Sequence, residues 1–393
     1  MSYATPYAGL KIVDISQGFA GPYCAGIFAL YGADVIKVEP FEGDWIRAIG
    51  ESYGGQTPLG MVANPHKRSI ALNLKSDAAC DIVHKLAADA DVFLESFRPG
   101  VSARLGVGFD EIKKINPNII YGSVSGFGQT GPYARRPGSD TVLQSFSGLV
   151  AVNKGNDEIP HRVGMLVPDT ITGVYAHQAV AAALAGRGDE VEGIHLDLSL
   201  AQAMGAFLAP KIIERVLAGG EPRILNAPAG SYETSDGGYI GLALVKEDQY
   251  ARICDAMGLE GVRDDPRYVD FELRAKNFNT LKPVFEARFK EKTADEWVQI
   301  MRESDILAER INSTDDWLND AHTIETGMAP EVEQAGIGCI PFPIVPGTTP
   351  RDANTDQLFP AIGEHGRDVL TGLGIDSEAI EALVAEGAVY LPE

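Results

Sequence analysis

The chain has 393 residues and a formal net charge of −22, from 55 acidic and 33 basic side chains. Such acidity disfavours nucleic acids and anionic membranes as partners, because binding many phosphate groups requires a basic surface. Hydrophobic residues make up 45% of the chain, enough for a sizeable core, and the length favours two domains or one large domain with an insert.

The four cysteines are scattered and form no C-x-x-C pair, which indicates reduced thiols in a cytoplasmic protein. The seven histidines show neither H-x-x-x-H nor H-E-x-x-H spacing, so we expect no metal site. The N-terminus has no pattern of a secretory signal, and no apolar run approaches the roughly 20 residues of a membrane span. We therefore expect a cytoplasmic protein that does not enter a membrane.

Strand and helix signals alternate over residues 9–125. Strands that alternate with helices predict a parallel sheet covered on both faces, and thus an α/β fold. The predicted strands are 10–15, 34–38, 92–95 and 119–124, and the predicted helices are 22–31, 77–88 and 110–115.

Residues 126–148 are rich in Gly, Pro and polar residues and predict a long loop that leads into a helix. Long loops in compact domains are more often functional than idle. Beyond it the sequence predicts a helix over 170–184, a strand over 195–198, a helix over 200–217 and a candidate linker over 219–230.

The rest of the chain predicts a smaller α+β unit and a final segment. A hairpin is expected over 232–244, turning at Ser235-Asp-Gly-Gly238. The expected helices are 246–257, 277–289 and 294–303, followed by a strand-like run at 340–345 and two short helices within 357–388.

One carboxylate, Asp169, stands between the apolar run 164–168 and the helical run 170–184. Aspartate is among the commonest N-cap residues, and backbone N–H groups with the helix dipole keep such a carboxylate ionised. Spacing alone favours a cap. A nucleophile is the alternative, and the two roles are compatible because ionised carboxylate is the reactive form.

The first strand is followed by Gly18-Phe-Ala-Gly21-Pro, and the second ends at Glu39, which gives a superficial likeness to a dinucleotide-binding fold. That fold needs G-x-G-x-x-G, so that the backbone can approach a pyrophosphate. The close-approach glycines are missing here. A nicotinamide-dependent oxidoreductase is therefore a distant alternative, and no G-x-S-x-G motif marks a serine nucleophile.

Motifs spread over nearly the whole chain occur in a fixed order. Together they resemble the family III CoA-transferases (the CaiB/BaiF family), which include formyl-CoA transferase and carnitine CoA-transferase. The motifs are GLKIVDIS (9–16) with AGP (20–22), YGADVIKVE (31–39), KRSIALNLK (67–75), ESFRPG (95–100), SGFGQTGP (125–132), LFPAIGEH (358–365) and VLTGLG (369–374).

The resemblance implies a CoA-transferase whose nucleophile is Asp169. The Asp169 carboxylate would form an anhydride with the donor acyl group and then an aspartyl-CoA thioester, from which an acceptor carboxylic acid takes the CoA. No cofactor would be bound permanently, since CoA and acyl-CoA are substrates. The implied CoA contacts are Arg98, Arg104, Leu72, Lys75, Phe97 and Arg136, and Phe19 would lie at the acyl end. The alternatives are core packing for Leu72, Phe97 and Phe19, and solvated surface cations for Lys75 and Arg136.

The same family contains α-methylacyl-CoA racemases, which use a His/Asp pair to exchange an α-proton. Ser139 occupies the place of that histidine, and serine is no base near neutral pH without an activator. Transfer is therefore favoured, and a racemase or epimerase is the alternative. Asp140 follows in the same segment and has two interpretations. It supports Asp169, or its side chain hydrogen-bonds its own turn. Ser139 and Asp140 together suggest a wider or more polar acceptor pocket.

The family's architecture implies a large Rossmann-like α/β domain formed by both chain ends, a smaller α+β domain, and an interlocked homodimer. The expected boundaries are 1–218 for the first part of the large domain, 219–230 for the linker, 231–330 for the small domain and 331–393 for a linker and the return. The expected partners are an acyl-CoA and a small carboxylic acid whose identity the sequence does not reveal.

Overall fold

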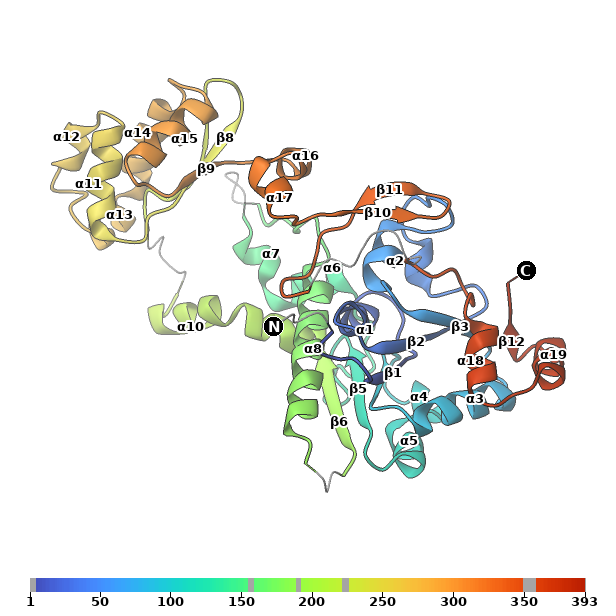
Figure 1. The fold of residues 1–393 in the computed structure, drawn as a ribbon. Coiled ribbons are helices and arrows are strands. Elements are labelled where there is room, and N and C mark those ends of the chain that lie inside the picture. The colour runs from blue at the N-terminus through green and yellow to red at the C-terminus, as the bar shows by residue number, and fades with distance from the viewer. Residues whose placement is uncertain (1–4, 155–158, 189–191, 221–225, 349–357, 393) are drawn as a thin grey trace. The chain divides into compact units, whose positions relative to one another are not determined.

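The computed structural model describes residues 5–154, 159–188, 192–220, 226–348 and 358–392. Its contacts divide the chain into one unit of Met1–Pro210 with Met328–Glu393 and a second of Lys211–Gly327 (Figure 1). Both ends of the chain thus build the larger unit. The contacts assign 211–218 to the smaller unit, whereas the sequence boundary places them in the larger one, and residues 221–225 of the candidate linker lie outside the described residues.

The larger unit is built on a seven-stranded sheet in the order β12-β3-β2-β1-β4-β5-β6. Every neighbouring pair is parallel except β12 on β3. The parallel α/β fold expected from the sequence is confirmed. The strands are β1 (Lys11–Asp14), β2 (Asp34–Glu39), β3 (Arg68–Leu72), β4 (Val92–Glu95), β5 (Ile120–Ser125), β6 (Ile194–Ser199) and β12 (Val389–Tyr390).

The order 3-2-1-4-5-6 is that of doubly wound folds, and its direction reverses between β1 and β4. In such sheets ligands bind beyond the carboxyl ends of the strands at this switch point. The segments that follow β1 and β4 are therefore where a site is expected.

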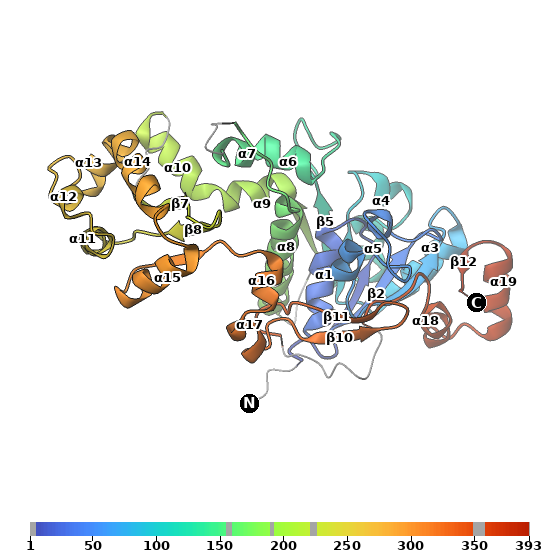
Figure 2. The same cartoon turned by 90° about the horizontal axis from the view of Figure 1, so that it is seen from above.

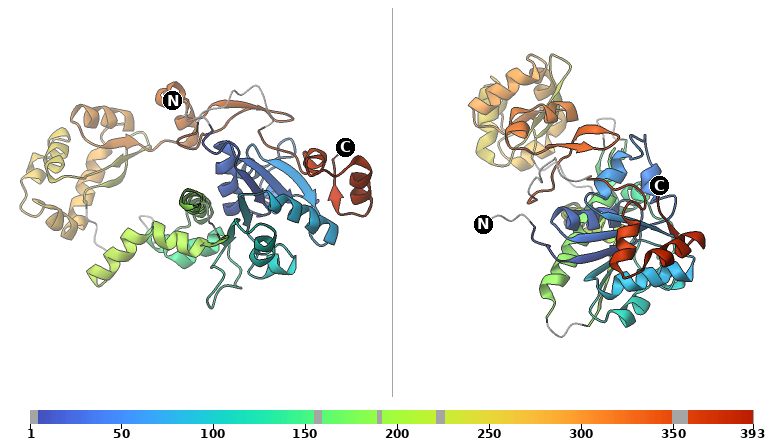
Figure 3. Two further views of the ribbon diagram at one scale, coloured as in Figure 1. Left: turned by 60° about the horizontal axis from the view of Figure 1, so that its bottom comes forward. Right: turned by 45° about the vertical axis from the view of Figure 1, so that its right-hand side comes forward.

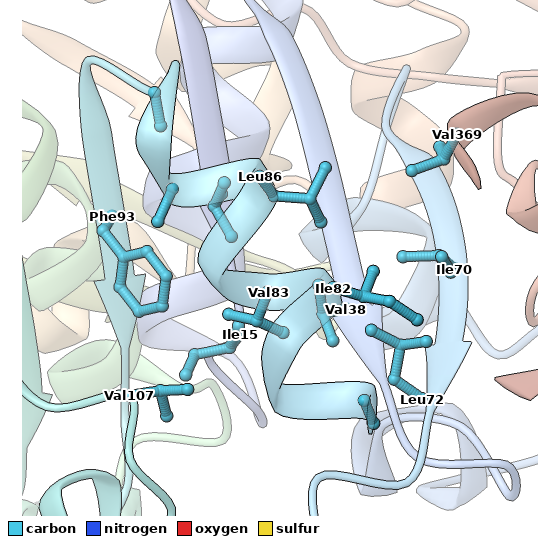
Figure 4. Close-up of a cluster of buried hydrophobic side chains, with 14 of the residues drawn as sticks. Ile15, Val38, Ile70, Leu72, Ile82, Val83, Leu86, Phe93, Val107 and Val369 are labelled. Atoms are coloured by element: carbon cyan, nitrogen blue, oxygen red, sulfur yellow. The ribbon is translucent and has the colours of Figure 1, made fainter. Parts of the chain in front are cut away.

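Alternate residues of the strands face opposite layers of helices, as the two-residue period of a strand requires. Ile12 of β1 packs with α1 (Ala20–Leu30) and α8 (Val167–Gly186), whereas Val13 packs with α3 (Asp77–Ala88) on the other face. Figure 4 shows Ile82, Val83 and Leu86 of α3 over the strands. The same layer includes α5 (Phe109–Ile115), α18 (Gly366–Gly372) and α19 (Ser377–Ala385), the last two drawn red at the sheet edge in Figure 3.

Helices α1 and α8 lie side by side (Figure 2) and approach closely at Gly173. A Cβ there would lie 2.8 Å from Cδ1 of Tyr23 and 2.9 Å from the carbonyl oxygen of Ala20. Only glycine fits this contact without a shift of the α1 backbone. The contact fixes the first turns of α8 against the start of α1.

The other elements of the larger unit surround this framework. The helix predicted over 200–217 is interrupted at Leu208, because Pro210 lacks an N–H and its ring clashes with a preceding carbonyl. The elements are η1 (Trp45–Ala48), α2 (Pro58–Ala63), α4 (Val101–Arg104), α6 (Asp140–Ser147), α7 (Leu149–Val152), α9 (Leu200–Phe207), the start of α10 (Ala209–Ala218), and the antiparallel pair β10 (Glu331–Gln334) and β11 (Gly338–Pro341).

The smaller unit has a three-stranded antiparallel sheet and its own core around Trp297, Phe285 and Phe289. The predicted hairpin is formed by β7 and β8, and the three predicted helices appear as α11, α14 and α15. The elements are β7 (Gly230–Glu233), β8 (Tyr239–Leu242), β9 (Ala308–Arg310), α11 (Glu247–Ala256), α12 (Glu260–Arg263), α13 (Phe271–Lys276), α14 (Phe278–Phe289), α15 (Ala294–Glu303), α16 (Thr314–Leu318) and α17 (Ala321–Glu325).

Candidate active site

A buried lysine, Lys67, holds the start of α1 against β1 and the segment before β3. The Lys67 ammonium donates to Asp14 Oδ2 at 2.8 Å, Asn64 Oδ1 at 2.9 Å and the Pro22 carbonyl at 2.7 Å. Burial lowers the pKa of Lys67 to about 8, although Asp14 opposes this shift. With three acceptors around it, this ammonium ties β1 and α1 to the segment before β3.

A second buried lysine fixes the loop between β1 and α1. Lys37 donates to Asp44 Oδ2 at 2.8 Å and to the Ser16 carbonyl, and Asp44 Oδ1 accepts the Gly18 N–H at 2.8 Å. Both side chains of the ion pair are fully buried. The loop at the switch point is therefore held rigidly by internal charges.

Glu39, the acid at the end of β2, is already bound on both oxygens. Arg47 donates to them at 2.8 and 2.9 Å, and the Ser69 hydroxyl and the Asp44 N–H donate at 2.6 and 2.9 Å. Burial opposes ionisation, but Arg47 and Lys37 hold the pKa of Glu39 below its ordinary value. A dinucleotide-binding fold needs this acid for a ribose hydroxyl. Its bonds here therefore argue against the oxidoreductase alternative.

A pocket of about 410 Å³ lies beyond the carboxyl ends of β1 to β4. Of the expected CoA contacts, Leu72, Lys75 and Phe97 line it. Apolar walls with a few polar groups are typical of ligand pockets. Sequence reasoning missed most of the lining, although the ends of successive parallel strands were a usable signal for it. The remaining lining residues are Ile15, Gln17, Val38, Glu39, Pro40, Phe41, Glu42, Asn73, Leu74 and Leu105.

The other expected CoA contacts, Arg98, Arg104 and Arg136, are exposed and are not among the lining residues of that pocket. Arg98 and Arg104 are chain neighbours of the lining residues Phe97 and Leu105. Arg136 lies in the loop after β5. Within the described ranges, none of the three arginines forms an ion pair with a carboxylate, so their guanidinium groups are available to phosphate.

Arg136 is nonetheless held in place by aromatic rings. Its guanidinium carbon lies 5.4 Å from the ring centre of Phe127 and 5.2 Å from that of Tyr133. Phe146 packs edge-on to both rings. The cation is therefore pre-oriented in the long loop that the sequence marks as functional.

Asp169 lies in the first turn of α8, but not at its N-cap. The helix begins at Val167 with Leu166 as the cap, so the expected N-cap position is wrong by three residues. Proline is tolerated in a first helical turn because its missing N–H is not needed there, and Pro168 therefore does not delay the helix. Burial and the nearby Asp140 carboxylate raise the pKa of Asp169 to about 7.

The Asp169 carboxylate accepts no hydrogen bond from any residue that the structure describes. Its backbone N–H, in contrast, donates to Asp140 Oδ2 at 3.4 Å. The side chain is half-buried. No cation of a described residue lies within ion-pair distance of it. No described residue donates to either oxygen, so this carboxylate can attack a carbonyl carbon.

Asp140 is the first residue of α6 and is buried. Its Oδ1 accepts a hydrogen bond of 2.7 Å from Gln144, which also binds the segment before α8. Burial raises the pKa of Asp140, and the Gln144 bond opposes this shift. The structure thus brings Asp140 and Asp169 together. The adjacent Ser139 is exposed and makes no side-chain bond to the helix start.

Phe19 caps α1 without a side-chain bond, and its ring is buried. It stacks on Tyr23 with 5.2 Å between ring centres and packs in one apolar cluster with Ile46 and Leu166. Leu166 is the residue that precedes α8. Phe19 is therefore near the helix start that carries Asp169.

Two other kinds of feature are absent from the described residues. No cluster of three or more His, Cys, Asp or Glu side chains there could hold a metal ion. No helix in the same part of the chain is long and apolar enough to cross a membrane.

Comparisons with known proteins agree across the chain. A family model described as CoA-transferase family III matches residues 7–366. An acyl-CoA transferase of Fusarium pseudograminearum is 33% identical over 97% of this chain and 88% of its own. The succinyl-CoA:glutarate CoA-transferase of Mus musculus is 32% identical over 98% of this chain and 90% of its own. A CaiB/BaiF family protein from Brucella suis has the same fold, with a TM-score of 0.81 and 29% identity over 94% of this chain and 100% of its own.

Proposed function

The chain belongs to CoA-transferase family III and is a transferase, and on this premise we propose that it transfers CoA through covalent intermediates on Asp169. The single observation that supports this most is the Asp169 carboxylate, which lies in the first turn of α8 with no described donor on either oxygen. The comparisons identify a CoA-transferase, and CoA thioesters are therefore its substrates.

In the proposed route an Asp169 oxygen attacks the carbonyl of the acyl-CoA, and the C–S bond breaks. This gives a mixed anhydride and the CoA thiolate. The thiolate attacks the aspartyl carbonyl and releases the donor acid as a carboxylate, which leaves an aspartyl-CoA thioester. An acceptor carboxylate attacks this thioester, the thiolate leaves again, and its attack on the new acyl carbonyl restores Asp169. Each step exchanges one acyl bond for another.

The location of Asp169 supports nucleophilic attack. The N–H groups of the first turn of α8 stabilise negative charge, which favours the ionised nucleophile. Partial burial removes water that would solvate the carboxylate and hydrolyse an anhydride. Burial and the Asp140 carboxylate oppose the effect of the helix and raise the pKa of Asp169 to about 7, so the group is ionised above neutral pH.

For CoA we propose the pocket beyond β1 to β4. Leu72 and Phe97 would contact the adenine, and Lys75 lines the same pocket. Arg98, Arg104 and Arg136 would hold the phosphates, because the rigid guanidinium fork suits phosphate oxygens. Phe19, Ser139 and Asp140 would shape the acyl and acceptor side.

For the acids we propose short dicarboxylates as the first class to test. The mouse relative's name gives succinyl-CoA and glutarate as its substrates, and that protein is 32% identical over 98% of this chain. Such an acid carries a second carboxylate, for which the exposed Ser139 hydroxyl before α6 can donate a hydrogen bond, whereas Asp140 offers no donor.

The test is intact-protein mass spectrometry after incubation with succinyl-CoA, followed by addition of glutarate. Wild-type protein should gain one CoA, which hydroxylamine removes, and glutarate should convert it to glutaryl-CoA. Asp169→Asn should form no adduct and lose turnover by at least about a thousandfold. Asp77→Asn, also in a first helical turn, is the matched control and should behave as wild type.

An adduct-free wild type with a panel of acyl-CoA donors would refute the covalent route. Deuterium uptake at the substrate α-carbon without an acceptor acid would instead favour the racemase alternative.

A further inference from the structure

Gln144 is a fully buried side chain whose amide joins α6 to the segment before α8. Its Oε1 accepts the Val163 N–H at 3.0 Å. Its Nε2 faces the carbonyls of Val163 at 3.2 Å and Met165 at 3.0 Å, which can only accept. The orientation of the amide is therefore fixed, and Nε2 must be the atom that donates to Asp140 Oδ1.

Asp140 consequently meets a donor on each carboxylate oxygen. Oδ1 accepts from Gln144 at 2.7 Å, and Oδ2 accepts from the Asp169 backbone N–H at 3.4 Å. A proton on either oxygen would face a donor, so this arrangement favours the ionised form. Arg162, bonded to the neighbouring Thr141 hydroxyl at 3.3 Å, adds positive charge near Asp140.

The two aspartates are thus treated differently by their surroundings. Asp140 has two donors and a nearby guanidinium, whereas the Asp169 carboxylate has no donor among the described residues. When two carboxylates share a site, their repulsion disfavours ionisation of the one that is less well stabilised. The standing charge of the pair therefore belongs on Asp140.

We propose that Asp140, clamped by Gln144, is a positioning residue whose negative charge favours the acylated form of Asp169 over its free carboxylate. The proposal rests on the function proposed above. Free Asp169 carries a negative charge that Asp140 repels. In the anhydride and in the thioester that charge is gone, because it has left with the thiolate or with the released carboxylate. Acylation therefore relieves the repulsion.

The test measures the equilibrium between free enzyme with succinyl-CoA and the enzyme-CoA thioester with succinate, which needs no second acid. Intact mass gives the fraction of thioester at several ratios of succinate to succinyl-CoA. Asp140→Asn should lower the equilibrium constant for thioester formation about tenfold, since a like charge nearby shifts such equilibria by at least about one pKa unit. Asp140→Ser, which also removes the charge, should act alike if the asparagine variant folds poorly.

Two further variants separate charge from structure. Gln144→Met removes the clamp and should shift the constant in the same direction, because Asp140 can then turn away from Asp169. Ser145→Ala, on the exposed side of the same helix, is the control and should match wild type.

The outcomes are distinguishable. A wild type without thioester refutes the proposed function. If the wild type forms the thioester and both Asp140 variants have an unchanged equilibrium constant for its formation, the role of Asp140 is refuted. An unchanged constant in Gln144→Met shows that Gln144 does not position Asp140.

Discussion

Asp169 is a residue on which opposing effects act. The first turn of a helix favours a charged carboxylate by typically 0.3–1 kcal/mol, as an order of magnitude. Burial and the Asp140 carboxylate disfavour the charge, and together they raise the pKa of Asp169 to about 7. The disfavouring effects prevail, so the fold is less stable when its reactive group is charged.

This conflict predicts that Asp169→Asn stabilises the protein. In the unfolded chain the pKa of an aspartate is about 3.9, so the penalty of ionisation is absent below about pH 4, grows up to pH 7 and is complete above it. At pH 8 the variant should gain about 1–2 kcal/mol, or a few degrees in Tm, after allowance for the partial exposure of the group. Thermal melts of both proteins between pH 4 and 8 measure this, and a constant difference across that range would contradict it.

At the scale of elements, the contact between α1 and α8 determines where the nucleophile lies. Gly173→Ala would place a Cβ 2.8–2.9 Å from Tyr23 and from the Ala20 carbonyl. The backbone atom cannot yield without moving α1, so we expect a loss of about 1–3 kcal/mol in the free energy of unfolding, despite the better helix propensity of alanine.

Gly205 in α9 provides the matched control, because a Cβ there meets no atom within 4 Å. Gly205→Ala should therefore raise the free energy of unfolding by about 0.5–1 kcal/mol. Urea titrations of both variants give the comparison. Equal effects would show that the close approach at Gly173 is not restrictive.

Elements with strong local signals were predicted well from the sequence. Helices α3 and α15 and strand β4 have the predicted bounds, since their apolar period and flanking polar residues lie within a few positions. Strand β3 was recognised only as a motif, and β10 and β11 were not predicted as a pair. Short elements of this kind depend on partners elsewhere in the chain, as the bond from Gln334 to the Phe359 carbonyl illustrates.

Some residues of the candidate site were likewise predicted from the sequence, and others were not. Asp169 was predicted as the nucleophile from its segment, and Leu72, Lys75 and Phe97 were predicted as CoA contacts; the last three line one pocket. The clamp by Gln144 was not foreseen, because its partners Val163 and Met165 are about twenty residues away and no local period marks them. The N-cap prediction failed because Pro168 is tolerated inside the first turn, so the helix begins at Val167.

At the scale of the molecule, helix α10 carries several exposed large apolar side chains. Ile212, Ile213, Val216 and Leu217 are between 47% and 82% exposed. A row of large apolar side chains of this kind marks a surface for association. We propose that it contributes to a homodimer, which the family resemblance implies to be interlocked.

The prediction is that Val216→Glu with Leu217→Glu weakens self-association. Sedimentation velocity at micromolar concentration should show a dimer for the wild type and a larger share of monomer for the variant. Tyr239→Glu, an exposed aromatic in the smaller unit, is a control that should leave the dimer intact. A monomeric wild type would contradict the assignment of α10.

The pairing of β12 with β3 has a consequence for how the protein is made. Val389 and Tyr390 pair with Leu72 and Ala71, and the His365 N–H donates to the Ser69 carbonyl at 2.9 Å, so among the described residues this edge of the sheet is covered by segments synthesised long after β3. Until then β3 leaves the ribosome as an open edge, able to pair with a strand of another nascent chain. We expect chaperone dependence during translation, and low tolerance for truncation just before residue 389.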